Sequence, residues 1–570
     1  MKSNSRASTA NIATSKGSKS GSRSTTPNYL QTASTVSHIK VSTPWRLEYK
    51  YEEESLTFPK KLLFKDYLCK YPLDVLDLRG WTLSSAVFDI IFHECPNVRA
   101  LLLDDAAGLD LQCFESIRGL KQLRNLSLQR IISCPITPEI AQVLASFKLL
   151  KYLNLNECQC CTAVFQTISM SCANLKSLSL SKCTGLDDFG LHALGQMIQR
   201  FRILQKIDLS GCTDFGDDGL LDFFVAGFNF LSEVNLNNCR CVGTAALAGL
   251  RTKMPEIRTL SLSNMNMGST IFEWLSEGCR ALTHLDISSS VELDDAGLAR
   301  IGRWCRHLVH INASKCLLLT DHGVSGFFKQ FYGFLEEADF SGCIQLGSGT
   351  AHTLSRHATK LQIIKLNGLS KVDATSLTAL WSAARCLKQF EMCSNLSTTT
   401  THRKSSMPHF SDFVLANAIL PVETLTQVKF VGAFQITDVG ACVLARACVL
   451  LTSVDVSYCN SIGDVFLFEL AAHAVHLKSF IGTGCILITS EGAKALSTGK
   501  YTSLIFTERV LFCFYFFVKS CTVSILLKLN FVCHFRVLCR CLQRDAGAVG
   551  SQRLCQGHGR GPYCHRPGPA

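Results

Sequence analysis

The sequence predicts an α/β solenoid, a horseshoe with a parallel inner sheet and outer helices, and three observations support this fold. A short apolar pattern recurs at a regular interval along most of the chain. Apolar and polar residues alternate inside that pattern, and a helix start follows it in many units. A unit of this size cannot bury its own strand face, so neighbouring units must stack into a curved array.

The segments before the array are predicted to contribute little to it. Residues 1–43 are rich in Ser, Thr, Lys and Arg and contain no Asp or Glu, so we expect a disordered basic tail. A mitochondrial transit peptide is the alternative, but no amphipathic stretch accompanies this composition. Residues 44–72 are predicted to cap the first repeat.

The repeating unit has apolar residues at positions 1, 4 and 6 and a Cys or another small residue at position 9. Examples are LKSLSLSKC from Leu175, LQKIDLSGC from Leu204 and LTSVDVSYC from Leu451. Sixteen units, numbered here in chain order, begin between Leu73 and Leu477, most of them 25–27 residues apart. The sequence therefore predicts about 16 repeats over residues 73–500, with an insertion near 394–410 where one interval is 38 residues.

Each unit is predicted to contain a strand, a turn and a helix. Positions 4 and 6 alternate with polar residues, which is typical of a short strand with one buried face. After position 9 come helix starts such as TGLDDFGLHAL from Thr184 and VELDDAGLARI from Val291. Asp or Thr at such places caps a helix, and a following acid suits the helix dipole.

The 29 cysteines are interpreted as packing residues of a protein in a reducing compartment. The chain is long and its start has no apolar signal segment, which argues against a small secreted disulfide scaffold. We therefore expect a cytoplasmic protein, with the nucleus or the cilium as alternatives. Eight cysteines occupy position 9, where a small side chain fits inside the corner: Cys158, Cys183, Cys212, Cys239, Cys316, Cys343, Cys459 and Cys485.

The formal net charge of +12 belongs to the two ends of the chain, because residues 51–499 carry about −3. Nucleic-acid binding needs basic side chains gathered on one surface, and here they lie in the two ends of the chain, so no nucleic-acid partner is expected. A membrane partner is not expected either. The apolar run from Leu511 to Val518 is much shorter than the roughly 20 residues that a spanning helix needs.

Residues 501–570 have a different composition and are interpreted as an atypical non-repeat tail. The repeat pattern stops at Tyr501, and an aromatic run and a Gly/Pro/Arg/Cys-rich run follow. The abrupt change favours a mistranslated extension, such as a retained intron. Its Cys and His residues lack the paired spacing of common zinc modules, so no metal site is predicted.

The repeats resemble the cysteine-containing leucine-rich repeats of the F-box and leucine-rich-repeat proteins, from Leu73 to about Leu496. This resemblance implies a leucine-rich-repeat horseshoe that recognises substrates for an SCF-type ubiquitin ligase. It also implies an N-terminal F-box that binds a Skp-type adaptor and, through it, a cullin. Residues 44–72 would then be a degenerate F-box remnant, since FPKKLLFKDYL from Phe58 matches that module only in part. The alternative is a non-ligase scaffold, like the related repeat subunits of the ciliary dynein regulatory complex.

The concave face is the candidate binding surface, because positions 3, 5 and 7 point away from the core. No phosphate loop, nucleophile elbow or zinc-protease helix is present, so we predict no catalytic residue, no cofactor and no enzyme activity. His284 and His310, one unit apart and near Glu233 and Glu337, are interpreted as solvated surface rather than metal ligands. Position 5 forms a polar column, and its predicted protein-contact residues are Asn154, Asp208, Asn235, Asp286, Asn312, Asp339, Lys365 and Asp455.

Overall fold

A computed structural model describes most of the repeat array. The described residues are 74–132, 134–227, 230–247, 256–265, 268–331, 335–357, 360–394, 410–418, 424–497 and 503–505. The predicted basic tail, the predicted N-terminal cap and nearly all of residues 501–570 lie outside them. Most of the predicted insertion near 394–410 also lies outside.

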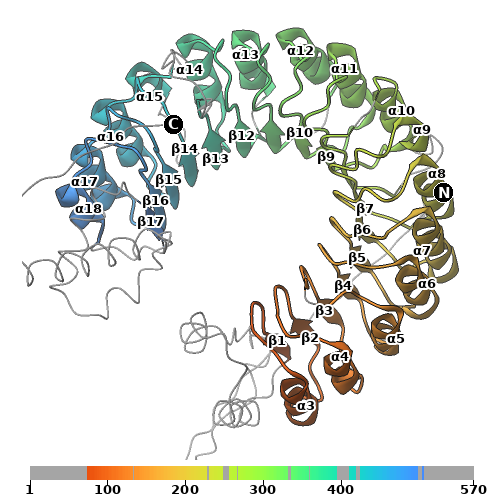
Figure 1. Ribbon diagram of the computed structural model, residues 1–570. Coiled ribbons are helices and arrows are strands. Elements are labelled where there is room, and N and C mark those ends of the chain that lie inside the picture. Colours follow the sequence, from red (N-terminus) through yellow and green to blue (C-terminus); the bar gives the residue numbers. More distant parts are fainter. Residues whose placement is uncertain are drawn as a thin grey trace, which may run out of the picture.

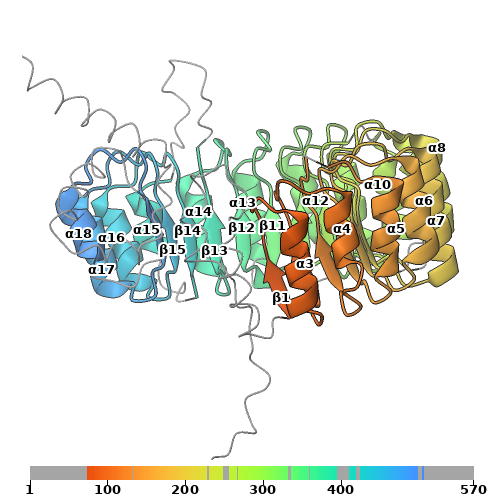
Figure 2. The same ribbon diagram turned by 60° about the horizontal axis from the view of Figure 1, so that its bottom comes forward.

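The described units form an open horseshoe with the strands on the inner curve and the helices outside (Figure 1). Seen from a direction turned by 60°, the same units form a curved band with turns along both rims (Figure 2). Each strand pairs in parallel with the next, and together they build one sheet. This architecture confirms the predicted leucine-rich-repeat horseshoe.

The strands occupy positions 3–5 of successive units, in the predicted register. Leu178 of one unit, for example, lies opposite Ile207 of the next, both at position 4. A further strand, β17, lies beyond the predicted end of the array at residue 500 and pairs with β16. The strands of the described chain are β1 Val75–Asp77, β2 Ala100–Leu102, β3 Asn125–Ser127, β4 Tyr152–Asn154, β5 Ser177–Ser179, β6 Lys206–Asp208, β7 Glu233–Asn235, β8 Thr259–Ser261, β9 His284–Asp286, β10 His310–Asn312, β11 Glu337–Asp339, β12 Ile363–Lys365, β13 Gln389–Glu391, β14 Gln427–Lys429, β15 Ser453–Asp455, β16 Ser479–Ile481 and β17 Ser503–Ile505.

One helix follows each strand from β1 to β16 and covers the outer face of the sheet. Within the described residues, no helix combines the length and the apolar character needed to cross a membrane. The helices are α3 Ser85–Glu94, α4 Leu111–Ile117, α5 Pro138–Ser146, α6 Thr162–Ser171, α7 Asp188–Phe201, α8 Asp217–Gly227, α9 Thr244–Leu247, α10 Ile271–Gly278, α11 Asp295–Trp304, α12 Asp321–Gln330, α13 Ser348–His357, α14 Ala374–Ala383, α15 Asp412–Ala418, α16 Asp438–Ala447, α17 Asp464–His473 and α18 Ser490–Ser497.

The core runs continuously along the array between the sheet and the helices. Position 4 and position 6 side chains, such as Ile207 and Leu209, are buried together with apolar helix residues such as Leu220 and Phe223. Each buried aliphatic or aromatic side chain contributes about 1.5–3 kcal/mol before chain entropy is subtracted. Stacking therefore stabilises units that could not fold singly.

A left-handed residue at position 8 turns the chain out of each strand. Lys182 has a φ of 52° and Glu157 a φ of 57°, whereas Gly211 takes the same conformation at 71° without a side-chain penalty. Among the described units, the one exception is unit 13, where Ser394 precedes the insertion. A conformation that costs free energy is repeated because the turn geometry must be the same in every stacked unit.

Carboxylates at the helix starts connect each unit to the next. Asp321, the first residue of α12, accepts hydrogen bonds from the Gly347 N–H at 2.8 Å and the Thr350 hydroxyl at 2.6 Å, both in the following unit. In seven contacts of this kind the earlier unit supplies the carboxylate and the later unit the donors. We call this set the Asp ladder; its members are Asp188, Asp217, Asp295, Asp321, Asp412, Asp438 and Asp464.

An aromatic cluster keeps the core continuous between the residues before the insertion and those after it. Trp381 of α14 packs edge-on against Phe390 of β13, with ring centroids 4.9 Å apart. Phe410 and Phe430, from the far side of the insertion, pack on each other at 4.8 Å and on both of these rings. The sheet therefore continues in register although the sequence interval is 38 residues.

Candidate functional site

The concave face of the sheet presents the side chains of positions 3 and 5. All eight residues predicted to contact a protein partner lie there, each at the last residue of its strand. The strand register places them in one row along the inner curve. Their contact with a partner stays a prediction.

Seven of these eight side chains also hold their own turns. The side-chain oxygen of Asp208 accepts a hydrogen bond from the N–H of Ser210, two residues on, at 3.0 Å. This turn closes the strand end and leaves the carboxylate half-buried, so the position 5 residues stabilise the turns as well as facing the concave side. The same contact, at 2.9–3.1 Å, is made by Asn154, Asn235, Asp286, Asn312, Asp339 and Asp455.

Position 3 carries side chains that are not used by the turns. His284 and His310 stack with ring centroids 4.2 Å apart and an interplanar angle of 13°. His310 Nδ1 lies 2.8 Å from Glu337 Oε2, and Lys365 Nζ lies 3.0 Å from the other carboxylate oxygen. A second pair, Lys206 with Glu233 at 2.6 Å, lies at the same level of the sheet. We call these six residues the concave patch.

The charges of the concave patch are partly set by burial. Burial lowers the pKa of His284, the adjacent His310 lowers it further, and Glu233 and Glu337 oppose the shift. Burial raises the pKa of Glu337, but hydrogen bonds from Lys365 and His310 outweigh it, so this pKa lies below its ordinary value. The patch therefore holds the acid Glu337, whose ionised form is favoured, beside His284, whose protonated form is disfavoured.

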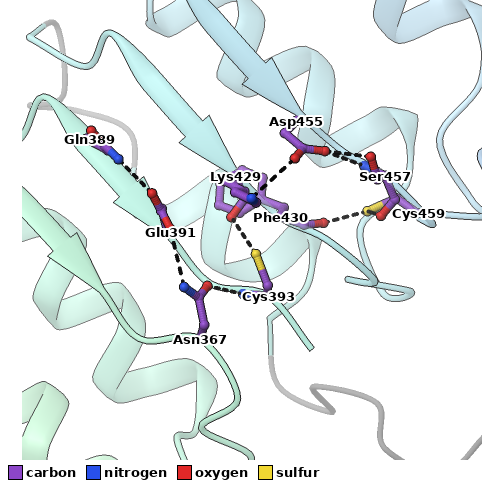
Figure 3. A network of polar contacts seen from close by, with 9 residues as sticks. All are labelled: Asn367, Gln389, Glu391, Cys393, Lys429, Phe430, Asp455, Ser457 and Cys459. Carbon is purple, nitrogen blue, oxygen red and sulfur yellow. Dashed lines mark hydrogen bonds and ion pairs between the residues drawn. The ribbon is translucent and has the colours of Figure 1, made fainter. Parts of the chain in front are cut away.

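A second polar network joins strands β13, β14 and β15 on the same face (Figure 3). Gln389 donates to Glu391 at 2.6 Å, and Lys429 pairs with Asp455 across the sheet at 3.7 Å. Asn367 donates to Glu391 at 3.3 Å and accepts from the Cys393 N–H at 2.8 Å. Sequence reasoning missed the ion pairs of both networks, although opposite charges at positions 3 and 5 of neighbouring units could have indicated them.

The position 9 cysteines are buried, as predicted. The Cys316 thiol donates to the carbonyl of Ile287, the position 6 residue of the preceding unit, at 3.4 Å, and burial raises its pKa to about 12. Cysteine thus fills the corner and gives a carbonyl a weak donor, which alanine would not do. Cys183 differs: its Sγ lies 3.5 Å from Cys160 Sγ and 3.2 Å from the Cys158 carbonyl oxygen.

Across the part of the chain that the structure describes, no group of three or more His, Cys, Asp or Glu side chains is arranged to hold a metal ion. The stacked His284 and His310 have Glu337 on one side, but Lys365 occupies the other oxygen of that carboxylate. The arrangement suits recognition by ion pairs and hydrogen bonds.

Comparison with known proteins agrees with the repeat geometry. A curated relative, F-box/LRR-repeat protein 4 from Bos taurus, is 26% identical over 203 residues, which are 35% of this chain. The chain is a cysteine-containing leucine-rich-repeat protein that resembles the F-box and leucine-rich-repeat family. The matched stretch of this leucine-rich-repeat chain spans 28% of the relative's length. No family model matches the chain.

Two solved structures are also similar to this leucine-rich-repeat protein. The yeast Rad7 and Elc1 complex aligns with 14% identity and a TM-score of 0.45, covering 68% of this chain and 86% of that chain. The TLR13–ssRNA13 complex aligns with 16% identity and a TM-score of 0.43, covering 76% of this chain and 62% of that chain.

Proposed function

We propose that this chain is the substrate-recognition subunit of an SCF-type ubiquitin ligase in the cytoplasm and that it acts by binding rather than by catalysis. The repeat array is a protein-interaction solenoid. The finer assignment is supported by one observation, the 26% identity over 203 residues to F-box/LRR-repeat protein 4. The partners in this proposal are a target protein on the concave face, a Skp-type adaptor and a cullin.

The concave patch is the proposed target contact. Glu233, His284 and Glu337 present side chains that the turns do not use, and acids outnumber bases from β6 to β11. Acidic side chains on a concave sheet favour a target with basic or hydrogen-bond-donating groups. Lys206 and Lys365 pair with two of the acids and set their orientation.

A non-ligase scaffold, such as a ciliary leucine-rich-repeat component, is the second candidate. The observation that favours it is residues 44–72, where only part of an F-box pattern is present. Both candidates use the same concave face and differ in the partners that the chain recruits.

Affinity purification of the full chain with mass spectrometry tests the proposal. The test variant is Glu233→Lys with Glu337→Lys, which reverses two paired acids of the concave patch. The matched control is Glu273→Lys with Glu469→Lys, which reverses two ion-paired acids on the outer helices.

Recovery of a Skp-type adaptor and a cullin with all three proteins, and loss of a further protein in the test variant alone, is the expected result. Recovery of axonemal proteins without adaptor or cullin would overturn the ligase assignment in favour of the scaffold. Equal loss of the target in the control variant would overturn the concave contact.

A further inference from the structure

The rim where the chain enters the strands is basic in units 3–6. We call the following residues the basic rim: Lys121, Arg124, Lys148, Lys151, Lys176, Arg200 and Arg202. Arg200 lies in the last turn of α7, and the other six lie between the end of one helix and the start of the next strand. From residue 119 to residue 206, the acids Glu139, Glu157, Asp187 and Asp188 all lie at helix starts or after position 6, on the opposite rim. Between residues 119 and 206, this rim of the near-neutral array therefore carries charges of a single sign.

Basic residues on adjacent units of this rim are joined directly by the backbone hydrogen bonds of the sheet. The Arg124 N–H donates to the Arg99 carbonyl at 2.8 Å, the Lys151 N–H to Arg124 at 2.7 Å and the Lys176 N–H to Lys151 at 2.8 Å. Neighbouring strands are about 4.8 Å apart, and like charges at this separation destabilise a sheet. Arg99 is paired with Asp74 at 3.7 Å. In the described chain, Arg124, Lys151 and Lys176 have no ion pair, so their repulsion is not relieved within the protein.

Helix dipoles account for part of the rim only. Lys148 donates from Nζ to the Ala145 carbonyl at 3.1 Å, which is the usual role of a base at a helix C-terminus. Arg124, Lys151 and Lys176 instead occupy position 2, at the strand entry, where no helix end needs a charge. Binding of an acidic group from another molecule explains their placement better than helix capping does.

A cavity of about 530 Å³ that is wide open to solvent lies between α5 and α6, at the Lys121 and Lys148 part of the basic rim. Lys121 and Lys148 line it, together with Gln142, Ser146 and Thr167. Two ammonium groups and neutral polar side chains suit one carboxylate of a bound ligand. The cavity and the position 2 row thus indicate the same ligand charge.

We propose that the basic rim binds an extended acidic protein segment, with carboxylates over Arg124, Lys151 and Lys176 and one acidic side chain in the cavity. The four successive neighbours Arg99, Arg124, Lys151 and Lys176 span about 15 Å along the rim. An extended segment of about five residues covers this length. Single-stranded nucleic acid is disfavoured because its binders stack successive bases on aromatic side chains. Of the two large aromatics that units 3–6 of the described chain expose, Phe189 lies at the start of α7 on the opposite rim, which leaves Tyr152, at 45%, beside the basic rim. The proposal concerns a different surface from the concave patch and does not depend on the ligase assignment.

Fluorescence polarisation with the full chain tests this proposal. The probes are a labelled Glu/Ser peptide of about ten residues, its Gln/Ser counterpart and a single-stranded oligonucleotide of similar length. The test variant is Arg124→Glu, Lys151→Glu and Lys176→Glu. The matched control is Arg130→Glu, Lys182→Glu and Lys315→Glu, three bases at position 8, on the opposite rim. A milder variant, Lys151→Gln with Lys176→Gln, removes charge without reversal and should raise the melting temperature slightly.

The expected result is salt-sensitive binding of the Glu/Ser peptide that weakens about tenfold or more in the test variant and about threefold or less in the control. The Gln variant should weaken it to an intermediate extent with the fold intact. Absence of peptide binding, equal weakening in the control, or tighter binding of the oligonucleotide through the same three residues would each overturn the assignment.

Discussion

Asp295 holds the start of the next helix by accepting two hydrogen bonds from Thr320. Its Oδ1 accepts from the Thr320 backbone N–H at 2.8 Å and its Oδ2 from the Thr320 hydroxyl at 2.5 Å. Asp295 is itself the first residue of α11, so one carboxylate serves the dipole of its own helix and the cap residue of α12. The Asp ladder thereby joins the units outside the sheet.

Asp295→Ala should lower the free energy of unfolding by about 1–2 kcal/mol, because it leaves the Thr320 donors without their acceptor. Urea unfolding followed by circular dichroism measures this change. The control is Asp218→Ala, which removes an exposed acid at the second position of α8. A loss at Asp218 as large as at Asp295 would contradict a role for the ladder.

Gly323→Ala should destabilise the chain, although alanine in a helix is ordinarily favoured over glycine by about 1 kcal/mol. A Cβ at residue 323 would lie 2.2 Å from Asp295 Oδ1. The double variant with Asp295→Ala should therefore cost less than the sum of the two single changes. Strict additivity in the urea series would show that Gly323 and Asp295 are not coupled.

Leu209→Asp should lower stability by more than about 4 kcal/mol, because Leu209, the residue after β6, is fully buried and offers no partner for a charge. Thermal unfolding is the measurement, and Gln205→Asp, at an exposed position of the same unit, is the control. An unchanged melting profile for Leu209→Asp would refute the assigned register.

Iodoacetamide at about pH 8 should label Cys161 and Cys386 well before the position 9 cysteines. The first two are exposed, whereas burial raises the pKa of Cys316 and of Cys459 to about 12, so both thiols stay protonated. Peptide mass spectrometry follows the labelling, and denatured protein supplies the reference for complete reaction. Labelling of native Cys316 as fast as Cys386 would contradict the buried thiol.

Stability should fall as the pH drops below about 6.5, in part through His284. The folded chain holds the pKa of His284 below its ordinary value of 6.5, so the neutral form is favoured. Its contribution is complete above 6.5 and is lost as the pH falls through 6.5 toward the lower folded value. His284→Gln should flatten the pH dependence of the melting temperature over this interval, and identical slopes would exclude the effect.

Strand placement was predictable because the stacked fold repeats one local rule. Leucine at position 1 and apolar residues at positions 4 and 6 must face the core in every unit, so the period alone sets the register of β5 against β6. The sequence pattern did not indicate β17, because a strand can pair through its backbone N–H and C=O groups after the repeat pattern has ended.

The candidate site was predictable only as a surface. The alternation of the strand places Asp208 and Asp286 on the concave face, but their hydrogen bonds to Ser210 and Ser288 depend on the turn at positions 7 and 8. The ion pair of Glu337 with Lys365 depends on which residues become neighbours across strands. Glu337 and Lys365 lie 28 residues apart in the sequence and become neighbours only when the units stack.

The Asp ladder has a direction, and this direction coincides with that of protein synthesis. Each carboxylate precedes the donors that it serves, so a growing chain already holds the acceptor for the next helix start when that helix leaves the ribosome. A unit that is added at the C-terminal side meets a carboxylate acceptor that is already in place. A unit that is added at the N-terminal side would have to bring the acceptor itself. Vectorial assembly, one unit at a time, is thus favoured by the order in which acceptor and donor are made.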